Sequence, residues 1–372
     1  PAPGPAAAPV EDDGRIYLTA QTYCHHVHDL ESDRVVPYTT GKLVEMTKLV
    51  DVLTTRGVHS PAPGYPLDVP PPLQPLMQYR VGALYSRHGA QPVDPISEPV
   101  VPYVWEMAEV MGHPVRGVPV YVTSPLRLAG ESFVVAMRYR NRLQHIQVSN
   151  MPAVGGSVPV LPFGALAVAT AEVVGGFVAL STATGLPVDF APSIFAFDLR
   201  HATLVYASPE AYLFGQLNAE LNEFYTPGRP RGRGHAPAGL NTRATVPGPQ
   251  AAAEKASLMT AGALIGARSF HGAGTLSLDE LFSAEQLLVD LEIKDQVERL
   301  IAGLDPGEKG YDWVEEVCQG VAGSFMALES TARHYRDTYW HPQLFDRGFL
   351  AHYGFDGRTR MAERARAMAR EY

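Results

Sequence analysis

The side chains best suited to chemistry are few and lie far apart in the sequence. Glu172 is the single charged residue of the apolar run 165–180. A buried carboxylate without a partner is costly, so Glu172 is either bonded by its neighbours or part of a site, and both interpretations stay open. His271 follows a short strand-like run and precedes Gly272 and Gly274, where a bulky ligand can approach the backbone. A lone histidine is more often structural, so the residues alone indicate a candidate and no role.

A second group of candidate residues lies near the N-terminus. Cys24, His25, His26 and His28 offer the thiol and imidazole ligands that bind zinc. Consecutive residues of a strand point to opposite faces, so these side chains do not converge on one ion. We expect one of the histidines to reach a pocket singly and no metal to be bound directly. A zinc site at this cluster is the alternative.

Composition excludes several classes of protein. The chain has 372 residues, 46% hydrophobic and 19% charged, as in a soluble globular protein with a large core. Its 30 basic and 39 acidic residues give a net charge of −9, which disfavours nucleic acid and anionic membrane surfaces as partners. Cys24 and Cys318 are too few for a disulfide framework, which fits a cytoplasmic protein. Proline and glycine interrupt the most apolar stretch, 158–180, so we expect no membrane span.

The elements that must position these residues follow a β-loop-α order. Short β-branched or aromatic runs lie at 120–122, 146–148 and 188–190, each before a helix-like segment. The predicted helices cover 43–53, 71–86, 132–142, 166–180, 209–224, 251–264, 283–302 and 313–332. Such alternation predicts an α/β fold, specifically a closed TIM (β/α)8 barrel. A doubly wound open sheet is the alternative.

The barrel domain is expected to span residues 16–347, after a flexible lead-in over 1–15 and before a C-terminal helical tail over 348–372. Segment 226–245 is rich in proline, glycine and arginine. It is either a solvated linker or a mobile loop over a site. No GxGxxG follows a strand and no GxxxxGK[ST] occurs, so nucleotide binding is disfavoured.

An ordered series of short blocks resembles the trimethylamine methyltransferase family, whose enzymes pass a methyl group from a methylated amine to a corrinoid cofactor. The resemblance covers about residues 30–347 and is strongest over 155–331. Each block alone is common, but their order and gaps agree together. The blocks are GGSVPV from Gly155, GAL from Gly164, TAE from Thr170, FDL from Phe197, SPE from Ser208, ATVP from Ala244, GAGTL from Gly272, EQL from Glu285 and FMAL from Phe325.

The resemblance implies a TIM barrel whose C-terminal face receives the cobalamin of a separate corrinoid protein. In trimethylamine-specific members a pyrrolysine lies just before the stretch matching 242–247, where this sequence has Asn241. Members without pyrrolysine resemble demethylases of glycine betaine and related quaternary amines, and we expect this activity here. The sequence also lacks a long segment usual at the family's N-terminus, which leaves open how the bottom of the barrel is closed.

A quaternary amine needs no general acid, because its leaving group is already a neutral amine. Positioning the methyl group in line with cobalt is then the main protein contribution. Trimethylammonium recognition favours aromatic faces and a nearby carboxylate, so Glu172 is expected to face the cation. The aromatic candidates at predicted strand ends, Phe195 and Phe270 first, are Tyr23, Tyr65, Phe195, Phe197 and Phe270.

The resemblance also suggests roles for polar and glycine positions. His271 is expected to hold a betaine carboxylate or touch the corrin ring, and Asn241 to donate its amide to that carboxylate. The glycines at which the cofactor is expected to approach the backbone are Gly155, Gly156, Gly272 and Gly274.

The expected partners are a corrinoid protein, a small quaternary amine and further copies of this chain. No DxHxxG stretch, the cobalamin-ligating signature, occurs, so the cofactor arrives on the partner. Arg229, Arg231 and Arg233 are expected to form part of the docking surface. Two alternatives remain, a zinc-assisted corrinoid methyltransferase for another methyl donor and a non-catalytic betaine-binding or scaffold protein.

Overall fold

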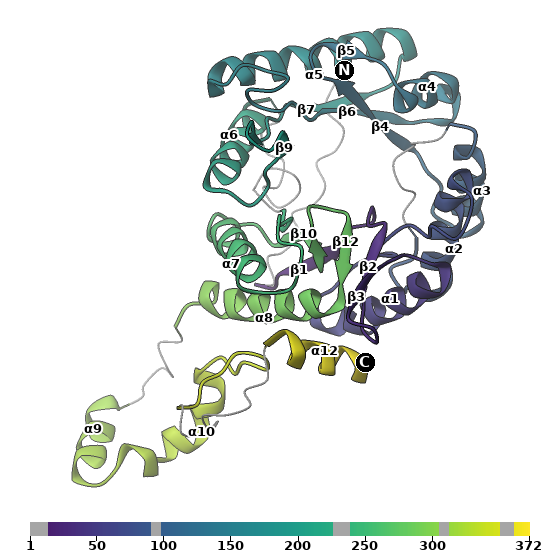
Figure 1. The fold of residues 1–372 in the computed structure, drawn as a ribbon. Coiled ribbons are helices and arrows are strands. Elements are labelled where there is room, and N and C mark those ends of the chain that lie inside the picture. Colours follow the sequence, from purple (N-terminus) through teal and green to yellow (C-terminus); the bar gives the residue numbers. More distant parts are fainter. Residues whose placement is uncertain (1–13, 91–97, 226–238, 305–311, 350–360) are drawn as a thin grey trace.

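Short strands line the inner side of the molecule and helices cover them from outside (Figure 1). The computed structural model describes residues 14–90, 98–225, 239–304, 312–349 and 361–372. Within them the fold is mixed α/β, with the predicted β-loop-α order along the chain.

The strands pair in four separate sheets. Two of them have four strands, in the orders β5-β4-β6-β7 and β11-β12-β2-β3, and two have two strands, β1-β10 and β8-β9. Four pairs of strands are parallel, so the carboxyl ends of the strands in each pair lie on the same side. They are β1–β10, β4–β6, β6–β7 and β12–β2. The strands are β1 (Tyr17–Ala20), β2 (His26–Asp29), β3 (Arg34–Pro37), β4 (Gly117–Thr123), β5 (Arg127–Leu128), β6 (His145–Asn150), β7 (Val188–Ala191), β8 (Phe197–Asp198), β9 (Thr203–Leu204), β10 (Ser269–Ala273), β11 (Thr275–Leu276) and β12 (Leu281–Ser283).

The helices lie close to the predicted ranges. They are α1 (Thr40–Val52), α2 (Gln74–Tyr85), α3 (Val101–Val110), α4 (Glu131–Arg138), α5 (Pro162–Thr184), α6 (Pro209–Tyr225), α7 (Pro249–Leu264), α8 (Ala284–Ile301), α9 (Trp313–Ala322), α10 (Glu329–Thr338) and α12 (Met361–Glu371). The single helix predicted over 313–332 is wrong, because the chain turns at Gly323 between α9 and α10. Helix α3 was not predicted, and α12 lies within the predicted helical tail.

A closed eightfold barrel stays a prediction, because the described strands do not join into one sheet. Single parallel bridges also join further segments of the chain. They connect Leu18 to Val58, Ala153 to Phe195 and Gly239 to His271. The last of these places the chain before α7 beside β10, which in turn pairs with β1 near the N-terminus. The first and last βα units are therefore neighbours.

Helix α5 is longer and more regular than the sequence predicted. It runs unbroken through Gly175 and Gly176, and Pro162 stands in its first turn, where proline is tolerated. By length and composition it is apolar enough to cross a membrane, with 33% of its most apolar window buried. Its Val173 and Leu180 pack with the buried valines of β4 and β6, so α5 covers that sheet.

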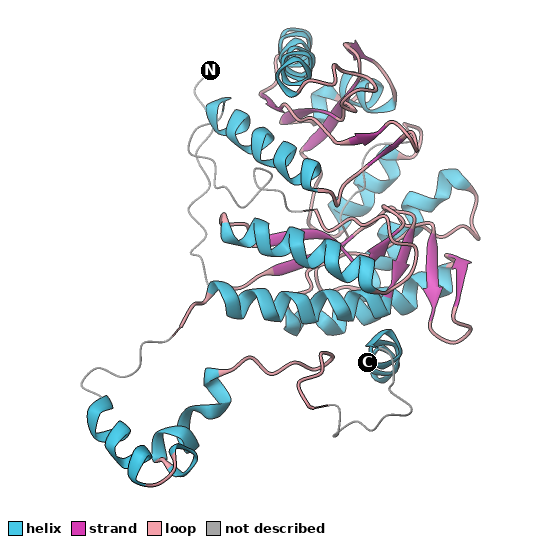
Figure 2. Ribbon diagram, turned by 60° about the vertical axis from the view of Figure 1, so that its left-hand side comes forward, coloured by secondary structure: helices cyan, strands magenta, loops and turns pink. Residues whose placement is uncertain are grey.

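The part of the chain after α8 leaves the body and returns to it. Helices α9 and α10 project away from the other elements (Figure 2). Helix α12 lies beside α8 again, where Ala365 and Ala369 join the largest hydrophobic core. The lead-in 1–13 lies outside the described residues.

Candidate functional site

Strand β10 separates a core face from an open face. Phe270 is fully buried in the hydrophobic core with Leu18 of β1 and Met259 of α7. Alternate side chains of a strand point to opposite faces, so His271 faces away from that core and is exposed. Desolvation nevertheless lowers the pKa of His271, because protein surrounds it from several directions. The expected aromatic role of Phe270 is therefore contradicted by its burial, whereas His271 is accessible to a ligand.

Asn241 lies directly beside His271. The Leu240 N–H donates to the His271 carbonyl at 2.7 Å, which fixes the neighbouring segment along β10. Asn241 is 5% exposed, and its Oδ1 has no hydrogen-bond partner among the described residues. A buried carbonyl oxygen without a donor is costly, so this position is suited to a ligand that donates or to a bound water.

The space beside Gly272 of β10 and beside Gly274 just after it is filled by other side chains of this chain. Gly272 has φ +87°, and a Cβ there would overlap the Asn241 side chain. Gly274 has φ +72°, and a Cβ there would lie 2.6 Å from the Phe282 ring. Both backbones are buried. The expected approach of a corrin ring to Gly272 and Gly274 is contradicted by this close packing.

A buried ion pair supports this strand from behind. Lys255 of α7 is fully buried and donates to Asp290 of α8 at 2.7 Å and to the Gly272 carbonyl at 3.1 Å. Asp290 also accepts from the Gly274 N–H and from Gln286. The charges are thus compensated and hydrogen-bonded, which a buried pair requires. Strand β10 is held rigidly at His271.

The turn between β11 and β12 projects over the same strand end. The Ser277 N–H donates to the Ala244 carbonyl and the Leu278 N–H to the Thr242 carbonyl, at 2.8 and 2.7 Å. Ser277 and Leu278 both have positive φ, 48° and 71°, which is unfavourable for residues with a Cβ. Two consecutive strained residues therefore set the position of Asp279.

On its other side the turn is bonded to the segment after β1. The Glu280 carbonyl accepts from the His25 N–H at 3.2 Å and from the His26 N–H at 3.0 Å. Asp279 thus lies between the Asn241 segment and the His25 segment. It is half-buried and forms no ion pair with any described residue. Desolvation, together with the charge of Glu280, raises the pKa of Asp279, although its own backbone N–H and His25 oppose the shift.

Aromatic rings gather near Asp279. Burial and the Asp279 charge raise the pKa of Tyr206 to about 12. The Tyr206 ring lies 6.0 Å from the Phe195 ring, and its hydroxyl donates to Met151 Sδ at 3.7 Å. These contacts place Tyr206 and Phe195 beyond the C-terminal ends of β6 and β7. Phe195 is half-buried, and its expected role as a substrate-binding ring stays a prediction.

A second pair of rings follows β1. Tyr23 and Tyr65 stack with ring centroids 6.5 Å apart, and the exposed His25 ring lies 5.9 Å from Tyr65. The Tyr65 N–H donates to the Cys24 carbonyl at 2.8 Å. Tyr23 therefore lies on the segment that binds the Asp279 turn, and Tyr65 lies on a neighbouring segment that is hydrogen-bonded to it.

Phe197 and the first glycine pair belong to a different opening. Phe197 packs against Gly156, whose Cβ would lie 3.3 Å from the ring, and Gly155 contacts Val160 and Leu199. Beside them is a cavity of about 420 Å³ with mainly apolar walls. Its lining residues are Val154, Val160, Ala196, Phe197, Asp198, Leu199, Val205, Ser208, Glu210 and Phe214.

Glu172 is bonded on all sides instead of facing a substrate. Its carboxylate accepts from the Ser124 hydroxyl at 2.9 Å, the Leu126 N–H at 3.0 Å and the Asn150 amide at 2.8 Å. Glu172 is 3% exposed. The expected role opposite a cation is therefore replaced by a structural one, the joining of α5 to the ends of β4 and β6.

The N-terminal cysteine and histidines are divided among different surroundings. Cys24 is fully buried, and burial raises the pKa of its thiol. His25 is exposed beside Tyr65, and the prediction that one histidine reaches a pocket singly stays a prediction. His28 points away from this site toward α8.

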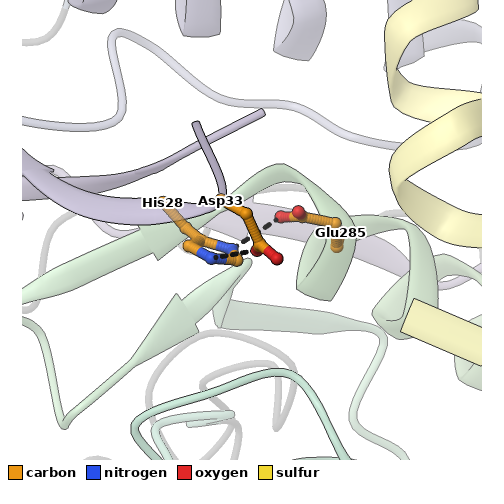
Figure 3. A group of neighbouring side chains, drawn as sticks. All are labelled: His28, Asp33 and Glu285. Carbon is orange, nitrogen blue, oxygen red and sulfur yellow. Dashed lines mark hydrogen bonds and ion pairs between the residues drawn. The ribbon is translucent and has the colours of Figure 1, made fainter. Parts of the chain in front are cut away.

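His28 instead joins a carboxylate group with the composition of a metal site (Figure 3). His28 Nδ1 lies 3.2 Å from Glu285, and Nε2 lies 3.1 Å from Asp33. Arg366 of α12 donates to Glu285 at 2.7 Å and also to Asp33. Because the guanidinium already supplies the positive charge between the two carboxylates, the cluster is explained as an ion-pair network that holds α12.

Sequence reasoning missed Asp279, Tyr206 and the network of Arg366. The residues around Asp279 are typical of a solvated turn, and only its contacts with distant segments distinguish it. Arg229, Arg231 and Arg233, the expected docking arginines, lie outside the described residues.

Comparison with known proteins places the chain among methyltransferases. The family described as "Trimethylamine methyltransferase (MTTB)" matches residues 105–372. Trimethylamine methyltransferase MttB of Methanosarcina thermophila is 32% identical over 281 residues, which cover 73% of this chain and 56% of that protein. Glycine betaine methyltransferase of Desulfitobacterium hafniense (strain Y51) is 29% identical over 229 residues, 60% of this chain and 46% of that protein.

The chain thus spans about half the length of these curated relatives. Among solved structures, the monomethylamine methyltransferase of Methanosarcina barkeri aligns with a TM-score of 0.45 and 11% identity, over 96% of this chain and 72% of that one.

Proposed function

The chain belongs to the trimethylamine methyltransferase family, and from this premise we propose that it transfers a methyl group from a quaternary amine to the cob(I)alamin of a separate corrinoid protein. The proposed substrate class is glycine betaine and related betaines. Cobalamin is the methyl acceptor and arrives on the partner protein, so it acts here as a second substrate.

The observation that carries the proposal is the convergence of Asn241 and His271 at one strand end beside aromatic rings. Asn241 stands where the resemblance indicates pyrrolysine in trimethylamine-specific members. A side chain that activates a neutral amine is not required for a quaternary one, since its leaving group departs uncharged. The Asn241 amide and the His271 ring provide polar groups for the betaine carboxylate, and Tyr206 and Phe195 provide ring faces for the methyl groups.

The proposed contribution of the protein is orientation. Reduced cobalt supplies the nucleophile when the corrinoid protein is bound, and the residues of this chain hold the ammonium group and keep one methyl group directed outward. We propose that the cofactor approaches from the side of Gly155 and Gly156, which lie next to Val160, Phe197 and Leu199 in the wall of an apolar cavity. The parallel pairs β1–β10 and β4–β6–β7 support a TIM barrel as the complete fold.

The test is an anaerobic spectral assay of methyl transfer. The protein is mixed with cob(I)alamin and with glycine betaine, other betaines or trimethylamine, and conversion to methylcobalamin is followed. We expect conversion with a quaternary amine and none with trimethylamine. Conversion with trimethylamine alone would contradict the substrate class. Failure with every amine, also in the presence of a corrinoid protein, would contradict the activity and favour a binding or scaffold role.

Self-association and a cytoplasmic location remain proposals that rest on sequence and family. The zinc-assisted alternative has no added support, because His28 is bonded into the network with Arg366.

A further inference from the structure

We propose that Asp279 is the carboxylate that binds the quaternary ammonium group of the substrate and makes the site selective for a permanent cation. The inference rests on the proposed function and goes beyond it by naming the residue that recognises the charge. It also replaces Glu172, which the sequence suggested for this role.

The first argument is position. The turn that carries Asp279 is bonded on one side to Thr242 and Ala244 and on the other to His25 and His26. Asp279 therefore lies between the two strand-end segments that hold Asn241 and Tyr23. Positive φ at both Ser277 and Leu278 costs about 1–3 kcal/mol each. Strain of this size persists when surrounding contacts enforce it, as they do here.

The second argument is the absence of a partner. Asp279 is half-buried and has no ion pair with any residue in the described part of the chain. The nearby ionisable groups are Glu280, which repels it, and His25, which only weakly compensates it. Cys24 and Tyr206 also lie within range of its charge, but neither supplies a positive charge. A cationic ligand would supply the compensation that the described residues do not provide.

The third argument is the chemistry of the surroundings. A quaternary ammonium ion has no N–H and donates no hydrogen bond, so it is recognised by ring faces and by an unbonded negative charge. Tyr206 lies near Asp279 on one side. Tyr23 and His25 lie on the segment bonded to the turn, and the Tyr65 ring packs against both of them. A carboxylate near aromatic rings, with its own backbone N–H as a donor and no ion pair among the described residues, matches this ion better than a primary amine, which needs several acceptors.

Glu172 shows what a carboxylate looks like when it is not free for a ligand. Its oxygens accept from Ser124, Leu126 and Asn150. The two acids therefore differ in the one property that ligand binding requires, which is an available negative charge.

The test compares two ligands of equal shape and different charge. Calorimetry measures binding of glycine betaine and of 3,3-dimethylbutanoate, in which carbon replaces the quaternary nitrogen, to the wild-type chain and to Asp279→Asn. We expect glycine betaine to bind at least about tenfold more weakly to the variant, and the neutral-headed ligand to change by less than about twofold. Glu220→Gln, an exposed carboxylate on α6, is the charge-matched control and should leave both affinities unchanged.

The outcomes separate the two proposals. If the wild type binds neither glycine betaine nor tetramethylammonium, the proposed function fails and the inference fails with it. If the wild type binds them and Asp279→Asn binds them equally well, only the inference is overturned. An equal loss for both ligands would also overturn it, because that result indicates altered shape and not lost charge. Asp279→Glu, which keeps the charge, should retain part of the affinity for glycine betaine and guards against a folding defect.

Discussion

The polar groups at the ends of β4 and β6 are hydrogen-bonded within the protein, whereas near the end of β10 one polar group lacks a hydrogen bond and another lacks an ion pair among the described residues. At the ends of β4 and β6, Glu172 accepts from Ser124, Leu126 and Asn150, so every oxygen of the carboxylate has a donor. At the end of β10, Asp279 has no ion pair and Asn241 Oδ1 has no donor among the described residues. Both regions are built on parallel strands, and both carry a buried or half-buried acid.

The difference indicates where a ligand belongs. Buried polar groups are normally satisfied, so unsatisfied groups that are held in strained positions are candidates for binding. At the ends of β4 and β6, the Glu172 carboxylate is bonded to Ser124, Leu126 and Asn150 and so holds the backbone there. The side of β10 is equally well supported, through Lys255 and Asp290, but leaves its outward groups free.

The largest effect is expected from the support behind β10. Lys255→Met leaves Asp290 buried without its cation, so we expect the free energy of unfolding to fall by about 3–5 kcal/mol. Urea denaturation followed by circular dichroism measures the loss. The double variant Lys255→Met/Asp290→Leu should regain most of the stability. A single variant as stable as the wild type would show that this region is not rigidly supported.

The next effect tests the satisfied side directly. Glu172→Gln keeps the size of the side chain but places an amide where donors point, so we expect a loss of about 2 kcal/mol in the free energy of unfolding. Glu220→Gln, an exposed carboxylate on α6, is the control and should change stability by less than about 0.5 kcal/mol. Unchanged stability combined with lost methyl transfer would return Glu172 to the catalytic role.

Replacement of Asp279, unlike replacement of Glu172, is expected to raise the free energy of unfolding at pH 7. The pKa of Asp279 is raised in the folded chain above its ordinary value of 3.8. Its contribution to stability is therefore full below that value and is lost as the pH rises through the raised pKa. Asp279→Asn removes this loss, so the variant should be slightly more stable than the wild type at pH 7, by less than about 1 kcal/mol. Thermal unfolding at pH 4 and pH 7 measures the difference, and a less stable variant at pH 7 would contradict the comparison.

An effect of similar small size concerns the ion-pair network of Asp33, Glu285 and Arg366, where His28 helps to hold α12. The hydrogen bond to Glu285 raises the pKa of His28 above its ordinary value of 6.5, although burial opposes the shift. Its contribution to stability is therefore full below 6.5 and is lost as the pH rises through the raised pKa. His28→Gln should flatten this dependence, with a loss of about 1 kcal/mol at pH 6. A pH series of urea midpoints measures it. An unchanged slope would show that Arg366 alone holds the helix.

Much of the fold follows from local pattern. The runs at 120–122, 146–148 and 188–190 lie in β4, β6 and β7, and the predicted helices correspond to most of those described. His271 was expected to follow a strand, but it lies within β10, which continues through Gly272 to Ala273. The burial of Phe270 was not predicted, because a five-residue strand does not indicate which face meets the core when both neighbours are of mixed character.

The sequence by itself determined the family, the α/β order and the residues available for chemistry, because ordered blocks and periodicity are properties of neighbouring positions. Only the tertiary structure decided which acid is satisfied and which is free. Glu172 is bonded from residues 22 to 48 positions away, and Asp279 is held by contacts with residues as distant as His25. Hydrogen-bond satisfaction depends on such distant contacts, so the fold determines whether an acid serves the structure or remains available to a ligand.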